Sequence, residues 1–231
     1  MQNNQSNIQK IIERSTNRHQ EQRKEFYLFG KWFYIKDAFV VPINVPLVID
    51  ELEAKIPSHL FEEVDEFFVG NFEFLTDKGL EALFKDGAIY ITNSILSETD
   101  LIENIIHELA HSLEQPHGQT IYADGLLRKE FLGKRGNLKT KLEQEHYDLG
   151  TLDFYNSEYD SRFDNFLYQV IGYGNLTPLV IGIYPSPYAA TSLREYWSVG
   201  FEDYFVGDRE YLKRVSPVLF SKIEEVISYE Y

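Results

Sequence analysis

The segment His107-Glu108-Leu109-Ala110-His111 carries the side chains of this chain that are best suited to chemistry. Its two histidines are four residues apart, and at that spacing on a helix they lie on one face, about 6 Å apart. Both imidazoles can therefore reach one metal ion. Glu108 is rotated by about 100° from His107, so it can stay off the metal and take a proton from a zinc-bound water. The H-E-x-x-H pattern predicts a zinc peptidase site.

The surrounding residues predict a well-defined helix. Ser97 and Asp100 form a capping box, with Ser97 as N-cap, and the helix is expected to end by Pro116. Apolar residues then recur at helical spacing: Leu101, Ile102, Ile105, Ile106, Leu109, Ala110 and Leu113. The alternative is that the two histidines and the glutamate simply lie on the solvated rim of an ordinary helix.

A catalytic zinc ion usually has three protein ligands, so a third ligand is needed. One candidate is His117, ten residues after His107, which matches the third histidine of H-E-x-x-H-x-x-G-x-x-H. That pattern needs a glycine where this chain has Glu114. It also needs a methionine turn, and the only methionine is Met1. Both departures weigh against His117.

The other candidate is Glu195, in TSLREYWSVGFEDYF. The apolar residues of this segment follow helical spacing, so packing would fix the Glu195 carboxylate. Ser192 and Glu195 also form a capping box, however, and Glu195 could simply cap its own helix. Spacing alone leaves both roles open.

The segment from Tyr188 to Ser198, YAATSLREYWS, carries a resemblance to a known family. It is similar to the Y-x-x-x-x-x-x-E-aromatic-aromatic-small segment that follows H-E-x-x-H in the catalytic domain of anthrax lethal factor and its relatives, including the Pro-Pro endopeptidases. These are gluzincin-like zinc metallopeptidases. The resemblance implies an α+β zincin-like fold and one Zn²⁺ per chain. It implies the following site: His107, His111 and Glu195 as zinc ligands, Glu108 as general base, and Tyr188 as the hydroxyl that stabilises the oxyanion.

The chain departs from this group in two places. Val199 stands where the group often has a second glutamate, four residues after the ligand. The stretch between His111 and Tyr188 is also longer than expected, so we interpret residues 117–175 as a long helical insertion. The resemblance covers roughly residues 60–116 and 184–231. The insertion and the N-terminal residues are therefore the parts expected to set substrate choice.

Composition limits the function further. The chain has 231 residues, 22 Lys and Arg against 37 Asp and Glu, a formal charge of −15 and no cysteine. Nucleic-acid and anionic-membrane partners are not expected, because both need basic side chains. Without cysteine, a metal must be bound by His, Asp or Glu. The N-terminus has no apolar h-region, so we expect no secretory signal and a cytoplasmic or virion-associated protein; chains with ATSLREY-like helices resemble tailed-phage products.

Other segments give a coarser prediction. Residues 1–25 read as a polar N-terminal arm and residues 26–231 as one zincin-like peptidase domain. Strands are expected from Phe26 and over Ala88–Thr92, and the second of these could be an edge strand to which an extended peptide adds. Helices are expected over these ranges: 48–55, 78–84, 126–147, 163–171, 193–205, and from Ser216-Pro217 onward.

The sequence thus predicts a zinc-dependent endopeptidase that acts on a peptide or protein substrate through a metal-activated water. The competing hypothesis is a non-catalytic zinc-binding structural or interaction protein, such as a virion or toxin component. Glu108 favours the enzyme, because a purely structural site does not require it. The oligomeric state stays open.

Overall fold

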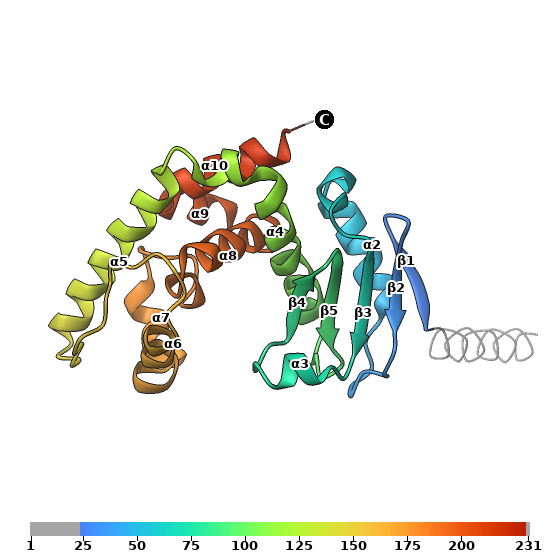
Figure 1. Ribbon diagram of the computed structural model, residues 1–231, viewed down its shortest axis with the longest axis horizontal. Helices are drawn as coiled ribbons and strands as arrows, with labels where there is room; N and C mark the ends of the chain where they lie inside the picture. The colour runs from blue at the N-terminus through green and yellow to red at the C-terminus, as the bar shows by residue number, and fades with distance from the viewer. Residues whose placement is uncertain (1–23, 230–231) are drawn as a thin grey trace, which may run out of the picture.

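The computed structural model describes residues 24–229, and its N-terminal part is a five-stranded mixed sheet (Figure 1). The strands are β1 (Glu25–Leu28), β2 (Lys31–Ile35), β3 (Glu66–Gly70), β4 (Ala82–Lys85) and β5 (Ala88–Thr92), in the order β1-β2-β3-β5-β4. Strands β2, β3 and β5 are parallel, and the two edge strands β1 and β4 are antiparallel to their neighbours. The predicted arm lies outside the described residues except for Lys24 and Glu25, and Glu25 already begins β1.

Helices make up most of the remaining chain, which confirms an α+β fold. They are α2 (Val45–Lys55), α3 (Glu73–Thr76), α4 (Glu98–Tyr122), α5 (Leu126–Gln144), α6 (Ser161–Asn165), α7 (Tyr173–Val180), α8 (Leu193–Val206), α9 (Arg209–Val215) and α10 (Pro217–Ile227). Short 3₁₀ turns η1 (Ser58–Phe61) and η3 (Tyr188–Ala190) and a π-helix η2 (Phe166–Ile171) complete them. None of the described helices is both long and apolar enough to cross a membrane.

Helix α4 joins the sheet to the helical half of the molecule. It contacts α2, β4 and β5 on one side and α8 and α10 on the other, and Figure 1 shows it between the two halves. The N-cap prediction is confirmed, since the Ser97 hydroxyl accepts a hydrogen bond from the Asp100 amide at 3.1 Å. The helix therefore starts where the capping box predicts and carries its apolar face into the core.

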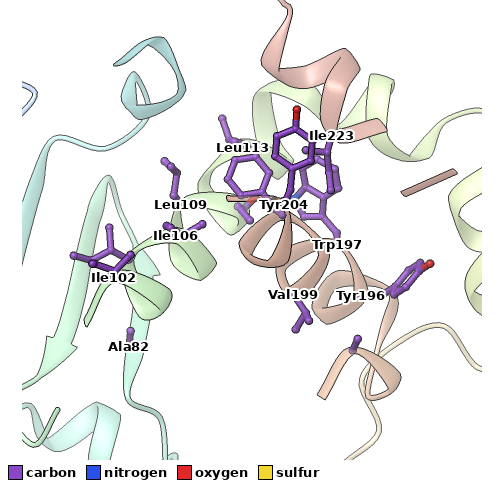
Figure 2. Close-up of a cluster of buried hydrophobic side chains, with 14 of the residues drawn as sticks. Ala82, Ile102, Ile106, Leu109, Leu113, Tyr196, Trp197, Val199, Tyr204 and Ile223 are labelled. Atoms are coloured by element: carbon purple, nitrogen blue, oxygen red, sulfur yellow. Dashed lines mark hydrogen bonds between the residues drawn. The ribbon is translucent and has the colours of Figure 1, made fainter. Parts of the chain in front are cut away.

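The interface between α4 and α8 is a cluster of large buried side chains (Figure 2). Trp197 of α8 is fully buried, and its indole Nε1 donates a hydrogen bond of 2.9 Å to the Ala110 carbonyl of α4. The acceptor residue, Ala110, lies between His107 and His111 in sequence. Burial of the indole ring and its hydrogen bond together fix where α8 lies along α4.

The sheet face opposite α2 and α4 carries a row of stacked aromatic rings. Trp32, Tyr34, Phe68 and Tyr90 are neighbours in this row, with ring centroids 5.4 to 5.5 Å apart. Side chains alternate between the two faces of a strand, so their neighbours in β2, β3 and β5 point into the core. Tyr34, Phe68 and Tyr90 are only partly exposed in this row, whereas Trp32 at its end is exposed.

The prediction that the metal-site helix ends by Pro116 is wrong. Helix α4 includes Pro116 and continues to Tyr122, and both His117 and Ile121 are buried in this last part. A proline costs one backbone hydrogen bond inside a helix. Packing of the two turns after it, where α4 contacts α10, outweighs that loss. The predicted insertion therefore begins with the end of α4.

The helix predicted over 78–84 is also wrong. Helix α3 ends at Thr76, and residues 82–85 form β4, which pairs with β5 through a two-residue turn. Asp86 and Gly87 both have positive φ, 52° and 79°, as a tight hairpin turn requires. The helix predicted over 126–147 is α5, which ends at Gln144. The one predicted over 163–171 is divided between α6 and the π-helix η2.

Candidate metal site

Three predicted ligands from two helices converge at one point. His107 and His111 lie on α4, and Glu195 lies in the first turn of α8. Glu195 Oε2 is 3.1 Å from His107 Nε2 and 3.7 Å from His111 Nε2. Each residue offers a ligand atom within 4.8 Å of the other two. This is a group of two imidazoles and one carboxylate that could hold a metal ion.

Glu195 takes part in both interactions that the sequence left open. Its backbone N–H donates to the Ser192 hydroxyl at 3.1 Å, which caps α8. Its carboxylate points to the imidazoles of α4. Capping therefore fixes the backbone of Glu195 while the side chain remains available to the site, so the residue does not merely cap its own helix.

Two further glutamates contact the other ring nitrogens of the histidines. Glu202 Oε2 lies 3.2 Å from His107 Nδ1, and Glu114 Oε1 lies 2.6 Å from His111 Nδ1. These contacts orient both rings with Nε2 toward Glu195. Carboxylates in this position are typical of metal-binding histidines.

The roles of Glu114 and Glu202 were not predicted from the sequence. Glu114 lies three residues after His111 and Glu202 seven after Glu195, so each shares a helix face with a site residue. This spacing is the only sequence feature that pointed to a role for Glu114 and Glu202 at the site. Charged residues recur at such spacing on many solvated helix faces, however, so the signal alone is weak.

Glu114 is itself held by two neighbours. Arg194 Nε donates to its Oε2 at 2.8 Å, and the Tyr122 hydroxyl donates to the same oxygen at 3.1 Å. Tyr122 is the last residue of α4 and is available only because the helix continues beyond Pro116. The unpredicted end of α4 thus helps to orient His111.

Burial and the carboxylates act in opposite directions on the site's ionisation. Burial alone would lower the pKa of His107, but Glu195 and Glu202 outweigh it and raise that pKa to about 10. Burial is likewise overcome at His111, where Glu114 and Glu195 raise the pKa to about 9. For Glu195, burial would raise the pKa, and the two histidines hold it well below its usual range. The metal-free site therefore holds protons where a cation would bind.

Glu108 lies beside the group without belonging to it. Its side chain is only 7% exposed, and its Oε2 accepts a hydrogen bond of 2.6 Å from the Phe84 amide of β4. This bond uses one of the two carboxylate oxygens. The edge strand of the sheet therefore fixes the orientation of Glu108.

Tyr188 lies on the same side of the molecule as the group. Its ring centroid is 6.1 Å from that of His107, and the residue opens the 3₁₀ turn η3 just before α8. Burial, followed by the negative charge of Glu195, raises the pKa of the Tyr188 phenol far above its usual value. Tyr188 therefore keeps its proton at any physiological pH.

His117 is not among the converging residues. It is buried, and its ring packs edge-on against Tyr229 at 5.4 Å. Val199 is buried too, so the position that holds an acid in the lethal factor group faces the core here. Glu202, three residues later, supplies a carboxylate to His107 instead.

Comparison of the chain with protein-family models, with curated proteins and with solved structures found no match. The resemblance to the lethal factor group therefore stays a prediction.

Proposed function

We propose that this chain is a zinc-dependent endopeptidase with a zincin-like fold. One observation carries the proposal: Glu195 lies beside His107 and His111 although 88 residues separate it from His107 in sequence. The H-E-x-x-H pattern predicts such a third ligand, and an ordinary solvated helix rim has no need of one.

The donor set fits zinc. Two imidazoles and a carboxylate are usual ligands of a catalytic zinc ion, and the chain has no cysteine to offer instead. The Nδ1 atoms are occupied by Glu202 and Glu114, so the ion would bind at the Nε2 atoms. The Nε2 atom of His107 also contacts the Ser198 hydroxyl at 3.2 Å. Bound there, zinc would polarise the scissile carbonyl and lower the pKa of a water to roughly 7.

Two side chains of the protein, Glu108 and Tyr188, would carry out the other steps. Glu108 accepts the proton of the attacking water on the oxygen that Phe84 does not use, and passes it to the leaving amine. Tyr188, which stays protonated, donates a hydrogen bond to the oxyanion as negative charge develops on it. No side chain needs to form a covalent intermediate.

An extended substrate peptide could pair with β4, which is an edge strand of the sheet. The earlier expectation that Ala88–Thr92 is an edge strand is wrong, because β5 lies between β3 and β4. The edge is β4, and the Phe84 amide on that edge already faces Glu108. An extended peptide adding to β4 would therefore pass next to the general base.

Replacing Glu108 by Gln tests this function. The Glu108→Gln chain should keep one zinc ion and lose cleavage of a peptide library read by mass spectrometry. The zinc-loaded wild-type chain should cleave the library. Zinc binding without any cleavage by the wild type would favour the non-catalytic zinc protein, and equal cleavage by both chains would refute the role of Glu108.

A further inference from the structure

The segment that connects Tyr188 to Glu195 is buried. Ala190 and Thr191 are fully inaccessible to solvent, and Ser192 is nearly so. These residues form the junction between the end of the 3₁₀ turn η3 and the start of helix α8. Its carbonyl groups still need hydrogen-bond partners, because an unpaired carbonyl inside a protein is costly.

Arg135 of α5 supplies those partners. Its Nε donates to the Ala190 carbonyl and its Nη2 to the Thr191 carbonyl, each at 2.7 Å. The guanidinium is 1% exposed and lies 3.7 Å from the ring centroid of Phe163. Burial lowers the pKa of Arg135 to about 10, so the group is still a cation at neutral pH. One planar side chain thus binds two consecutive carbonyls of the junction.

The same region supports the start of α8 from a second side. The Leu193 amide, in the first turn of α8, donates to the Ser157 carbonyl at 2.8 Å. Ser157, Phe163 and Arg135 all come from the stretch that the sequence analysis treated as an insertion linked to substrate choice. In the structure, part of that stretch holds the junction between the two site residues.

We propose that Arg135 is a positioning residue that sets Tyr188 relative to Glu195. Tyr188 begins η3, and Arg135 binds carbonyls at the end of this turn and just after it. Glu195 lies a few residues further on, in the first turn of α8. Moving the turn displaces the Tyr188 hydroxyl, whereas Glu195 remains held by the Ser192 cap and by the α4–α8 interface. The inference rests on the proposed function for Tyr188.

Arg135→Lys tests the proposal, and Lys134→Met is the matched control. Arg135→Lys keeps the charge but cannot reproduce the planar fork over two carbonyls. Lys134 is its neighbour, is similarly buried, and donates to the Ile183 and Val215 carbonyls instead. We expect Arg135→Lys to lower kcat by at least about tenfold with a smaller change in KM and with full zinc content. Lys134→Met should lower thermal stability and leave kcat within about threefold.

A double variant distinguishes positioning from general damage. If Arg135 acts through Tyr188, adding Arg135→Lys to Tyr188→Phe should lower kcat by no more than about twofold beyond Tyr188→Phe alone. Multiplication of the two separate effects would overturn the proposal. So would an unchanged kcat in Arg135→Lys.

Hydrogen exchange gives a readout that does not depend on activity. The Ala190 and Thr191 amides close the turn by donating to the Pro187 and Tyr188 carbonyls. Their protection should fall by at least about tenfold in Arg135→Lys and stay unchanged in Lys134→Met. Unchanged protection in Arg135→Lys would refute the proposed role of Arg135, even if the wild type proves to cleave no peptide.

If Arg135→Lys does not fold, Phe163→Leu replaces it. This variant keeps an apolar side chain but removes the ring beneath the guanidinium. We expect the same loss of protection at Ala190 and Thr191 to a smaller extent. No loss in a folded Phe163→Leu chain would contradict the proposal.

Discussion

At the scale of single residues, the site is defined by what holds each imidazole on its two sides. His107 lies between Glu195 and Glu202, and His111 between Glu195 and Glu114. The outer carboxylates fix the ring orientation and increase the basicity of Nε2. Contacts on both sides of each ring therefore hold the ligand atoms close together.

Removing the charge of Glu202 tests this arrangement. Glu202→Gln should weaken zinc binding by about 10- to 100-fold, since the carboxylate that faces His107 Nδ1 is replaced by a neutral, weaker acceptor. Competition with a chromophoric chelator measures the affinity. Glu103→Gln is the control. Glu103 lies on α4, close enough to Glu202 of α8 to interact with its charge, and it makes no hydrogen bond to either imidazole. An equal loss in both variants would mean that net charge, not the contact with His107, sets the affinity.

Residue spacing predicted only part of this site. Helix geometry alone predicts that His107 and His111, four residues apart, share a face. Glu195 could be chosen as the third ligand only through the resemblance to a family. Glu114 and Glu202 were missed because their role depends on how α8 lies against α4. That packing is a long-range property, and no local pattern contains it.

At the scale of elements, close packing of α10 against α8 stabilises the helix that carries Glu195. Gly200 of α8 leaves no room for a side chain, since a Cβ there would overlap the methyl group of Leu219. Helix α10 can therefore approach the backbone of α8. This contact keeps α8, and Glu195 with it, pressed against α4.

Alanine at position 200 should destabilise the fold. Gly200→Ala is expected to lower the free energy of unfolding by about 1 to 3 kcal/mol through overpacking. Urea denaturation followed by circular dichroism measures it. In Gly133→Ala on α5, a Cβ meets no atom within 4 Å, so the same substitution should be neutral or stabilising by up to about 1 kcal/mol. Equal effects in the two helices would contradict the packing role of Gly200.

The elements themselves were predicted unevenly. Helices with a cap and an apolar face, such as α4 and α8, begin where the sequence predicts. Strand β5 was predicted with its observed bounds, whereas β4, only four residues long, was taken for the end of a helix. The end of α4 was mispredicted because proline usually ends a helix, whereas here burial of the residues after Pro116 keeps the helix intact.

At the scale of the whole molecule, the site lies where two halves meet. Helix α4 belongs to the sheet half through β4 and β5 and to the helical half through α8, so a bound ion would link both. In the metal-free chain, protons on His107 and His111 take that place beside Glu195. Stability of the metal-free chain should therefore depend on pH in a defined direction.

The pKa values of about 10 for His107 and about 9 for His111 exceed the unfolded value of roughly 6.5. The folded chain thus binds more protons between these limits, and stability falls as the pH rises through this window. The added stability is fully present below about pH 6.5 and lost by about pH 10. We expect the stability difference between wild type and Glu195→Gln, measured by urea denaturation in EDTA, to shrink over this range. A difference that stays constant or widens would contradict this prediction.

The central claim is that His107, His111 and Glu195 bind one zinc ion. Elemental analysis of the purified chain, after equilibration with zinc and removal of the excess, tests it most directly, because a chain without cysteine has no thiolate site to confuse the result. We expect one zinc ion per wild-type chain and far less in Glu195→Gln. A wild-type chain that retains no zinc, or a Glu195→Gln chain that retains as much as the wild type, would contradict it.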